Sequence, residues 1–290
     1  MSSGTDHVSS GADHVTIFGS RLDSALTGRG SLCAGIDPHA GLLAAWGLGD
    51  DVAGLERFSM TCVEAFGDSV AVVKPQSAFF ERFGSAGVAV LERAVAGLRE
   101  QGALVLLDVK RGDIGSTMGA YADAYLNPSS PLAADAITVS PYLGVGSLDP
   151  AFQLAEANGA GVFVLALTSN PEGPQVQHAR GDDGRSVAQT VIDELAERNA
   201  GATPLGSFGV VVGATIGSSV AELSALNGPY LVPGVGAQGG TPDSVRRIFA
   251  ASLHNVIPSV SREILGAGPD VAALRAAVAR QVEAFAFLRA

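Results

Sequence analysis

The stretch that decides the fold is Ala103-Leu-Val-Leu-Leu-Asp-Val-Lys110, an apolar run that ends among charged residues. A run of Val and Leu of this length is typical of a strand buried on both faces, as in a parallel sheet covered by helices. Seven further short runs share its content of Val, Leu and Ile: 31–36, 70–74, 136–140, 161–167, 208–213, 230–233 and 255–260. The chain is therefore predicted to contain eight such strands.

Helical patterns fill the gaps between these strands. Apolar residues recur at spacings of three and four within 58–66, 88–98 and 187–196, as they do on the buried face of a helix. Thr241-Pro242 marks a helix start, because Thr is a good N-cap and Pro suits the first helical position. The last helix is predicted over roughly 270–288.

Eight strands that alternate with helices within about 250 residues predict an α/β fold, a single (β/α)8 TIM barrel. The alternative is a doubly wound open sheet, which usually has fewer strands, and no GxGxxG motif follows the first predicted strand. No linker or charge block divides the chain, so residues 16–290 are expected to form one domain. Residues 1–15 are rich in Ser, Gly, Asp and His and lack the pattern of a signal peptide, so we expect a flexible N-terminal leader.

The composition excludes several classes of function. Of the 290 residues, 47% are hydrophobic and 16% are charged, which is enough apolar material for a large core and argues against disorder. The net charge is −11, which disfavours nucleic acids and anionic membranes as partners. The sequence contains no run of 18 apolar residues, so no membrane-spanning helix is predicted. Two cysteines are too few for a disulfide framework, so a cytoplasmic location is expected.

Charged residues cluster at the end of the third predicted strand. Asp108 and Lys110 share one face because strand side chains alternate, and both end an apolar run, so we expect both to be poorly solvated. Asp113 follows just past the strand, near a helix that we expect to open at Ser116-Thr117. The alternative is a purely structural ion pair between Asp108 and Lys110, but buried pairs are weak stabilisers. A catalytic cluster is the better interpretation, since barrels carry their chemistry at the carboxyl ends of the strands.

Two further charged residues end the first and second predicted strands. Lys74 could extend its ammonium to solvent, and Asp37-Pro38 could be a simple turn. With the third strand beside them, a shared site is favoured. These side chains would then place Lys and Asp alternately around one side of the barrel mouth.

A glycine-rich stretch follows the seventh predicted strand, Pro233-Gly-Val-Gly-Ala-Gln238-Gly239-Gly-Thr241. Such a turn offers backbone N–H groups to an anion, and it leads into a helix N-terminus. Arg262 ends the eighth strand and can bind a phosphate through two N–H groups at once. The loops after strands seven and eight are the usual phosphate position in such barrels, so the sequence predicts a phosphate site there.

These residues carry a family resemblance. Asp108-x-Lys110-x-x-Asp113, with Lys74 on the preceding strand, resembles the signature of orotidine 5'-phosphate decarboxylases. The glycine-rich stretch from Pro233 is similar to the phosphate loop of that family, and Arg262 to its phosphate arginine. The sequence Lys110-Arg-Gly-Asp-Ile-Gly-Ser-Thr117 is similar to the longer bacterial subgroup.

The resemblance implies conversion of orotidine 5'-phosphate to uridine 5'-phosphate in pyrimidine biosynthesis, with no metal and no organic cofactor. Lys110 would protonate C6, and Asp108 would lie against the substrate carboxylate. Lys74 and Asp113 would complete a chain of alternating charges.

The resemblance also implies roles in substrate binding. Asp37 would bind the ribose hydroxyls, and Ser169, in Ser169-Asn-Pro after the fifth strand, would bind the pyrimidine amide edge. Gln238 and Arg262 would hold the phosphate together with the loop that contains Pro233 and Gly239.

A homodimer is implied as well, because Asp113 and Thr117 would reach into the partner subunit's site. The helix that follows Asp113 carries an apolar stripe, which could pack either on a partner or on its own barrel. The residues of this stripe are Met118, Tyr121, Ala122 and Tyr125.

Two other functions compete with this one. A metal-dependent phosphosugar barrel enzyme usually has an additional acidic ligand on the second strand, where this chain has Lys74. A barrel that binds nucleotides as a sensor, without turnover, would not need this set of buried charges.

Overall fold

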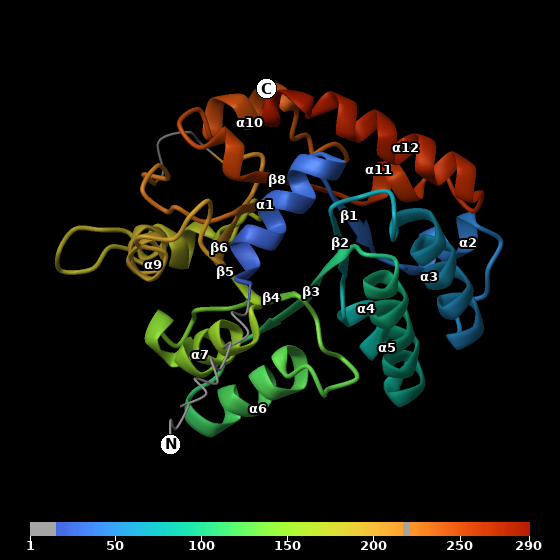
Figure 1. The fold of residues 1–290 in the computed structure, drawn as a ribbon, viewed down its shortest axis with the longest axis horizontal. Helices are drawn as coiled ribbons and strands as arrows, with labels where there is room; N and C mark the ends of the chain where they lie inside the picture. The colour runs from blue at the N-terminus through green and yellow to red at the C-terminus, as the bar shows by residue number, and fades with distance from the viewer. Residues whose placement is uncertain (1–15, 217–220) are drawn as a thin grey trace, which may run out of the picture.

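Eight parallel strands close into a barrel in their order along the chain, each hydrogen-bonded to the next and β8 to β1. The strands are β1 (Cys33–Ile36), β2 (Val72–Pro75), β3 (Leu104–Arg111), β4 (Ala136–Val139), β5 (Gly161–Leu167), β6 (Phe208–Val212), β7 (Tyr230–Val232) and β8 (Val256–Val260). The computed structural model describes residues 16–216 and 221–290 (Figure 1). Each predicted apolar run overlaps one of these strands, to within one residue at the ends of β2 and β3, so the predicted (β/α)8 TIM barrel is confirmed.

Within residues 16–216 and 221–290, a helix follows each strand except β6, and the helices surround the barrel (Figure 1). They are α1 (Phe18–Arg29), α2 (Ala40–Ala45), α3 (Val52–Phe66), α4 (Ala78–Glu81), α5 (Gly84–Glu100), α6 (Gly115–Leu126), α7 (Asp149–Asn158), α8 (Pro174–Gln177), α9 (Val187–Arg198), α10 (Pro242–Ile248), α11 (Arg262–Leu265) and α12 (Val271–Ala284). Short 3-10 helices are η1 (Val145–Leu148), η2 (Leu253–Asn255) and η3 (Ala286–Arg289). Thr241 caps α10 as predicted, accepting a hydrogen bond from Ser244 N.

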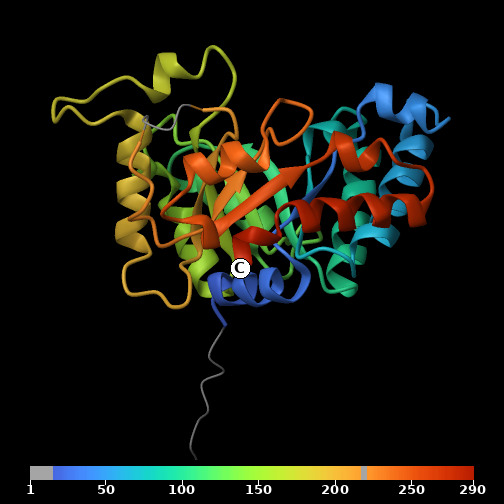
Figure 2. The same cartoon turned by 90° about the horizontal axis from the view of Figure 1, so that it is seen from above.

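Helix α1 closes the amino-terminal end of the barrel, opposite the loops that follow the strands (Figure 2). Its residues Phe18, Leu22 and Leu26 are buried among side chains from inside the barrel. Arg21 donates a hydrogen bond to Asp135 Oδ1 at 2.7 Å, which fastens the helix to the start of β4. Among the described residues, the cavity lies at the other end of the barrel.

Helix α6 differs in one respect from the prediction. It begins at Gly115 with Ile114 as its N-cap, so Ser116-Thr117 lie inside the first turn rather than before it. The side chains of Met118, Ala122 and Tyr125 are buried in the core of their own barrel. Tyr121, the fourth residue of the stripe, is partly buried and packs against the same core. The apolar stripe therefore packs on its own barrel.

The predicted leader, residues 1–15, lies outside the described residues, and the assignment of one domain to residues 16–290 stays a prediction. Between residues 16 and 290, leaving out 217–220, no helix combines the length and the apolar character needed to cross a membrane. Cys33 and Cys62 are buried and free.

Candidate active site

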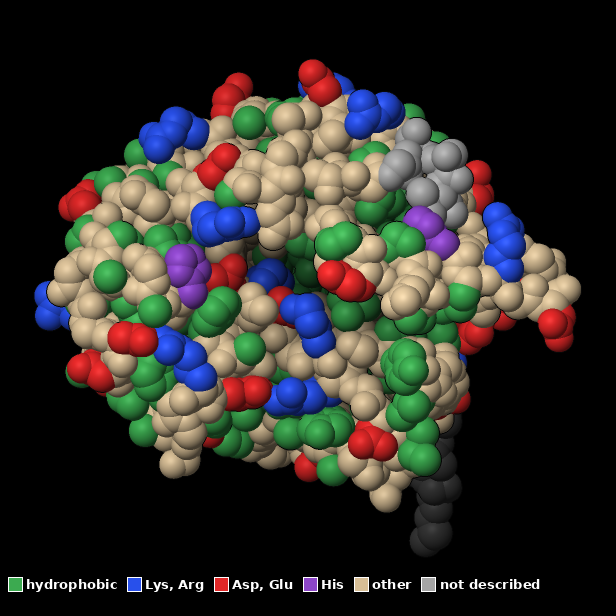
Figure 3. Space-filling model, turned by 180° about the vertical axis from the view of Figure 1, so that it is seen from behind, with side chains coloured by type: hydrophobic (Ala, Val, Ile, Leu, Met, Phe, Trp, Pro, Cys, Tyr) green, Lys and Arg blue, Asp and Glu red, His purple; other side chains and the backbone are tan. Residues whose placement is uncertain are grey.

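The carboxyl ends of the strands surround a cavity of about 300 Å³. It opens on the face shown in Figure 3, where Lys, Arg, Asp and Glu side chains gather around a hollow. Its lining includes these residues named from the sequence: Asp37, Lys74, Asp108, Lys110, Pro233, Gln238 and Arg262. Residues far apart in the chain thus meet at one site.

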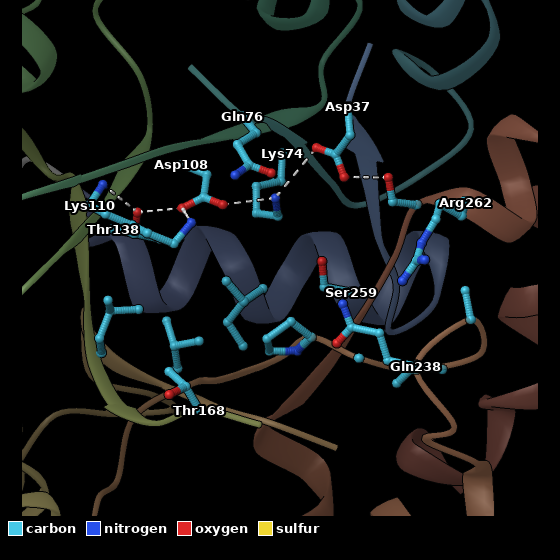
Figure 4. Close-up of a pocket in the computed structure, with 18 residues that line it drawn as sticks. Asp37, Lys74, Gln76, Asp108, Lys110, Thr138, Thr168, Gln238, Ser259 and Arg262 are labelled. Carbon is cyan, nitrogen blue, oxygen red and sulfur yellow. Dashed lines mark hydrogen bonds and ion pairs between the residues drawn. The ribbon is translucent and has the colours of Figure 1, made fainter. Parts of the chain in front are cut away.

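Charges alternate along one wall of this cavity (Figure 4). Lys110 Nζ lies 2.6 Å from Asp108 Oδ1, and Lys74 Nζ lies 3.1 Å from Asp108 Oδ2. Lys74 Nζ also lies 4.0 Å from Asp37 Oδ1. The order Lys110, Asp108, Lys74, Asp37 runs across the ends of β3, β2 and β1.

Lys74 and Asp108, the two groups in the middle of this row, keep each other ionised. The side chains of Lys74 and Asp108 are each only 8% exposed. Burial acts to lower the pKa of Lys74, but the carboxylates of Asp108 and Asp37 outweigh it and hold that pKa above its ordinary value. Burial acts to raise the pKa of Asp108, but Lys74 and Lys110 outweigh it and hold that pKa below its ordinary value.

The expectation that Lys110 is poorly solvated is wrong, since its side chain is 44% exposed. The pairing register of β3 with β4 shifts between Leu107 and Arg111, so the simple alternation of strand side chains does not hold there. Lys110 itself has φ of 47°, in the left-handed region that few residues other than Gly adopt. The ammonium consequently lies on the open side of the cavity, while Asp108 stays buried.

Lys74 and Lys110 are the only lysines among the 18 Lys and Arg residues of the chain. The other 16 of these residues are arginines, and a guanidinium cannot give up its proton in a protein. An ammonium can do so when its surroundings change. This pattern is a further sequence signal for the site.

The glycine-rich loop after β7 has a folded-back backbone. Gly234, Gly236 and Gly239 have φ of 89°, 75° and 90°, values that favour glycine because it lacks a Cβ atom. Gly236 N donates to Gly240 O at 2.8 Å, and Gly240 N donates to Gly234 O at 2.9 Å. Gln238 and Arg262 stand together on this side of the cavity (Figure 4).

Glu263 follows Arg262 but turns away from the cavity. It accepts a hydrogen bond from Gln281 Nε2 at 3.1 Å. Its carboxylate packs behind Gly236, where an added Cβ would lie 2.2 Å from Glu263 Cδ. The acid therefore supports the loop from behind and does not oppose an anion in front of it.

Four of the residues named from the sequence are absent from the cavity lining. Ser169 is exposed, and its neighbour Thr168, directly after β5, lines the cavity instead. Gly239 faces away, whereas Gln238 lines the cavity. Asp113 accepts a hydrogen bond from Ile114 N at 2.7 Å, and Thr117 is exposed on α6.

Polar residues that the sequence analysis missed complete the lining. They are Gln76, Thr138, Thr168, Ser259 and Ser261. Thr138 and Ser259 are single polar residues inside otherwise apolar strands, and that contrast could have revealed them. Ser261 Oγ donates to Asp37 Oδ2, which leaves Asp37 Oδ1 buried with no hydrogen-bond partner among the described residues.

The depressed pKa of Asp108 predicts a pH dependence of stability. Its folded pKa lies below the ordinary 3.8, so as pH falls the unfolded chain binds the proton first and unfolding is favoured. The contribution is present above about pH 4 and is lost below it. Asp108→Asn should flatten the dependence of the unfolding free energy on pH between about 4 and 3, as measured by urea titration. Parallel slopes in the two proteins would contradict this assignment.

Within residues 16–216 and 221–290, no group of three or more His, Cys, Asp or Glu side chains is arranged to hold a metal ion.

The sequence profile described as the "Orotidine 5'-phosphate decarboxylase / HUMPS family" matches residues 30–277. An orotidine 5'-phosphate decarboxylase of Salinispora tropica is 67% identical over 263 residues, covering 91% of this chain and 95% of the relative. One of Corynebacterium glutamicum is 54% identical over 271 residues, covering 92% and 97%. A crystal structure of a protein from Streptomyces avermitilis shares 62% identity at a TM-score of 0.92, covering 95% of this chain and 97% of that one. The resemblance seen in the signature is confirmed, and the chain belongs to the orotidine 5'-phosphate decarboxylase / HUMPS family.

Proposed function

We propose that this protein is a lyase of pyrimidine biosynthesis that converts orotidine 5'-phosphate to uridine 5'-phosphate. The observation that carries the proposal is the row of alternating charges, with Lys110 at its open end and Asp108 buried beside it. The glycine-rich loop and Arg262 stand across the same cavity. A nucleotide with one phosphate at one end and a carboxylate on its base matches such a site.

The reaction is difficult because of where its electrons go. When the bond from C6 to the carboxylate breaks, the electron pair stays on C6 in the plane of the ring, where the π system cannot delocalise it. Preorganised charge can stabilise this centre, and a nearby acid can protonate it. Lys110 supplies both the positive charge and the proton, because its ammonium is held 2.6 Å from Asp108 Oδ1 on the open side of the cavity. Its proton passes to C6, and CO2 leaves.

Asp108 and Lys74 prepare Lys110 for this step. Asp108 stays ionised because Lys74 and Lys110 hold its pKa low, so it repels the substrate carboxylate until CO2 departs. Lys74 Nζ lies within 4.0 Å of both Asp108 and Asp37 and fixes the two carboxylates relative to each other. The charges are in place before the reaction, so little reorganisation is needed.

Binding of the remote parts of the substrate supports the same reaction. Asp37 lines the cavity, and its carboxylate, with a side chain 17% exposed, can accept a hydrogen bond from a ribose hydroxyl. Gln238 and Arg262 would hold the phosphate, with Pro233 and Gly239 shaping the loop. Energy gained at the phosphate can orient the base at Lys110.

The role proposed for Ser169 at the pyrimidine edge stays a prediction. Thr168 is the residue of that loop that lines the cavity in this structure, so we include Thr168 as a candidate for the same contact.

We also propose a homodimer in which Asp113 and Thr117 complete the site of the partner. Asp113 lies outside its own cavity lining, which favours a place in the partner's site over one in its own. Beside it, Ile114 is 61% exposed, and Tyr142, in the loop after the neighbouring strand β4, is 81% exposed. Large apolar side chains of this kind are common at contacts between subunits.

The proposed activity predicts that the purified protein lowers the ultraviolet absorbance of orotidine 5'-phosphate and releases uridine 5'-phosphate. The rate should not change in excess EDTA, because the step assigned to Lys110 needs no metal ion. Absorbance and chromatography of the product measure both results. Saturable nucleotide binding without turnover would favour a sensor, and a loss of activity in EDTA that Mg²⁺ restores would favour a metal-dependent phosphosugar enzyme.

A further inference from the structure

The end of β4 holds the end of β3 through side chains as well as backbone. Lys110 N donates to Thr138 Oγ1 at 3.0 Å. Ser140 Oγ donates to Lys110 O at 3.0 Å, and Ser140 N donates to Arg111 O at 2.7 Å. Where the register shifts, the Thr138 hydroxyl thus replaces the backbone carbonyl that would bind Lys110 N in a regular ladder.

The hydroxyl of Thr138 has a fixed direction. Because its oxygen accepts from Lys110 N, its own proton is free for Asp108 Oδ1, to which it donates at 2.7 Å. Lys110 Nζ lies 2.6 Å from the same oxygen. One buried hydroxyl therefore contacts the backbone of Lys110 and the carboxylate that holds the Lys110 ammonium (Figure 4).

The backbone of Lys110 needs such support. Its φ of 47° is unfavourable for a residue with a side chain and persists only where neighbouring groups hold it. The side chain is also 44% exposed, so few packing contacts restrain it. The remaining restraints on the ammonium are its bond to Asp108 and the backbone position that Thr138 and Ser140 fix.

We infer that Thr138 is a positioning residue for the decarboxylation, acting through Lys110 and Asp108. The inference rests on the proposed function. The Thr138 hydroxyl sets the left-handed turn at Lys110 and the orientation of the Asp108 carboxylate together. Both ends of the Lys110–Asp108 pair are then held in the geometry that proton transfer to C6 requires.

The test replaces Thr138 in three ways. Thr138→Val keeps the shape and removes the hydroxyl, Thr138→Ala removes it without placing a methyl group against Asp108, and Thr138→Ser keeps it. The matched control is Ser31→Ala, which removes a buried hydroxyl that accepts from Arg289 Nε at 3.1 Å, just before β1. We expect kcat to fall about 10- to 100-fold for Val and Ala, since small misplacements of a reacting group have effects of this size.

The remaining readouts separate positioning from simple loss of structure. KM should stay within about threefold in all variants, because the groups assigned to phosphate and ribose are unchanged. Thr138→Ser should keep kcat within about threefold of the unchanged protein, and Ser31→Ala should leave kcat unaltered. Thermal melting shows whether each variant is folded, and Thr138→Ala replaces Thr138→Val in the comparison if the latter does not fold.

Three results would overturn the inference: normal kcat in both Val and Ala variants, an equal loss in Thr138→Ser, or a rise in KM with kcat intact. Turnover by the unchanged protein tests the proposed function separately. If the unchanged protein were inactive, both proposals would fall. If the unchanged protein were active and Thr138→Val and Thr138→Ala were equally active, only the role inferred for Thr138 would be wrong.

Discussion

Lys110→Ala is expected to remove turnover of orotidine 5'-phosphate almost completely, by about 10⁴-fold or more, because one group supplies both the proton and the positive charge. Binding of uridine 5'-phosphate should change little. The product has no carboxylate to interact with the ammonium, and the groups assigned to ribose and phosphate remain. The ultraviolet absorbance assay measures turnover, and isothermal titration calorimetry measures binding of uridine 5'-phosphate.

The control for this variant is Lys110→Arg, which keeps the positive charge. We expect it to be nearly as inactive as Lys110→Ala, because a guanidinium does not release a proton near neutral pH. Near-normal turnover by Lys110→Arg would show that charge alone suffices. Near-normal turnover by Lys110→Ala would remove Lys110 from the mechanism.

The two lysines allow a direct check on the same assignment. Lys74 is 8% exposed and Lys110 is 44% exposed, and the chain has no other lysine. An amine-directed acylating reagent should therefore modify the Lys110 side chain and spare that of Lys74. Bound uridine 5'-phosphate should slow this modification if the nucleotide covers Lys110.

The barrel can be predicted from the sequence because the same signal, a short apolar run, recurs eight times along the chain. Each run such as 103–110 is apolar on both faces, as a strand between a packed interior and a covering helix must be. The position of a site at the carboxyl ends follows from closure of the barrel, since every strand then ends on the same face. Asp37, Lys74 and Asp108 were predicted to share a site on this argument alone.

What the sequence did not predict depends on contacts between strands. The exposure of Lys110 follows from the register shift between β3 and β4, which no property of β3 alone reveals. Thr138 is the one polar residue of β4, but its role depends on its position opposite Lys110, which the sequence of β4 alone does not reveal. Thr168 rather than Ser169 lines the cavity, because the residue that points inward depends on where β5 ends.

The proposed exchange of Asp113 between subunits predicts restoration of activity in a mixed dimer. Lys110→Ala and Asp113→Asn should each be nearly inactive alone. When the two chains are co-expressed, half of the dimers are expected to be hybrid, and each hybrid has one site with both residues intact. About a quarter of all sites should then be active, a recovery far above either parent. Purification through two different tags isolates the hybrid, and its kcat per site gives the result.

A second pair of variants serves as the control for this experiment. Lys74 and Lys110 line the same cavity of one chain, so co-expression of Lys74→Ala with Lys110→Ala should give hybrids in which neither site is intact. Activity in the first hybrid and none in the second would assign Asp113 to the partner subunit. If purified hybrids of Lys110→Ala with Asp113→Asn were inactive, Asp113 would act within its own chain. Its carboxylate, which here accepts from Ile114 N at 2.7 Å, would then have to turn toward its own cavity.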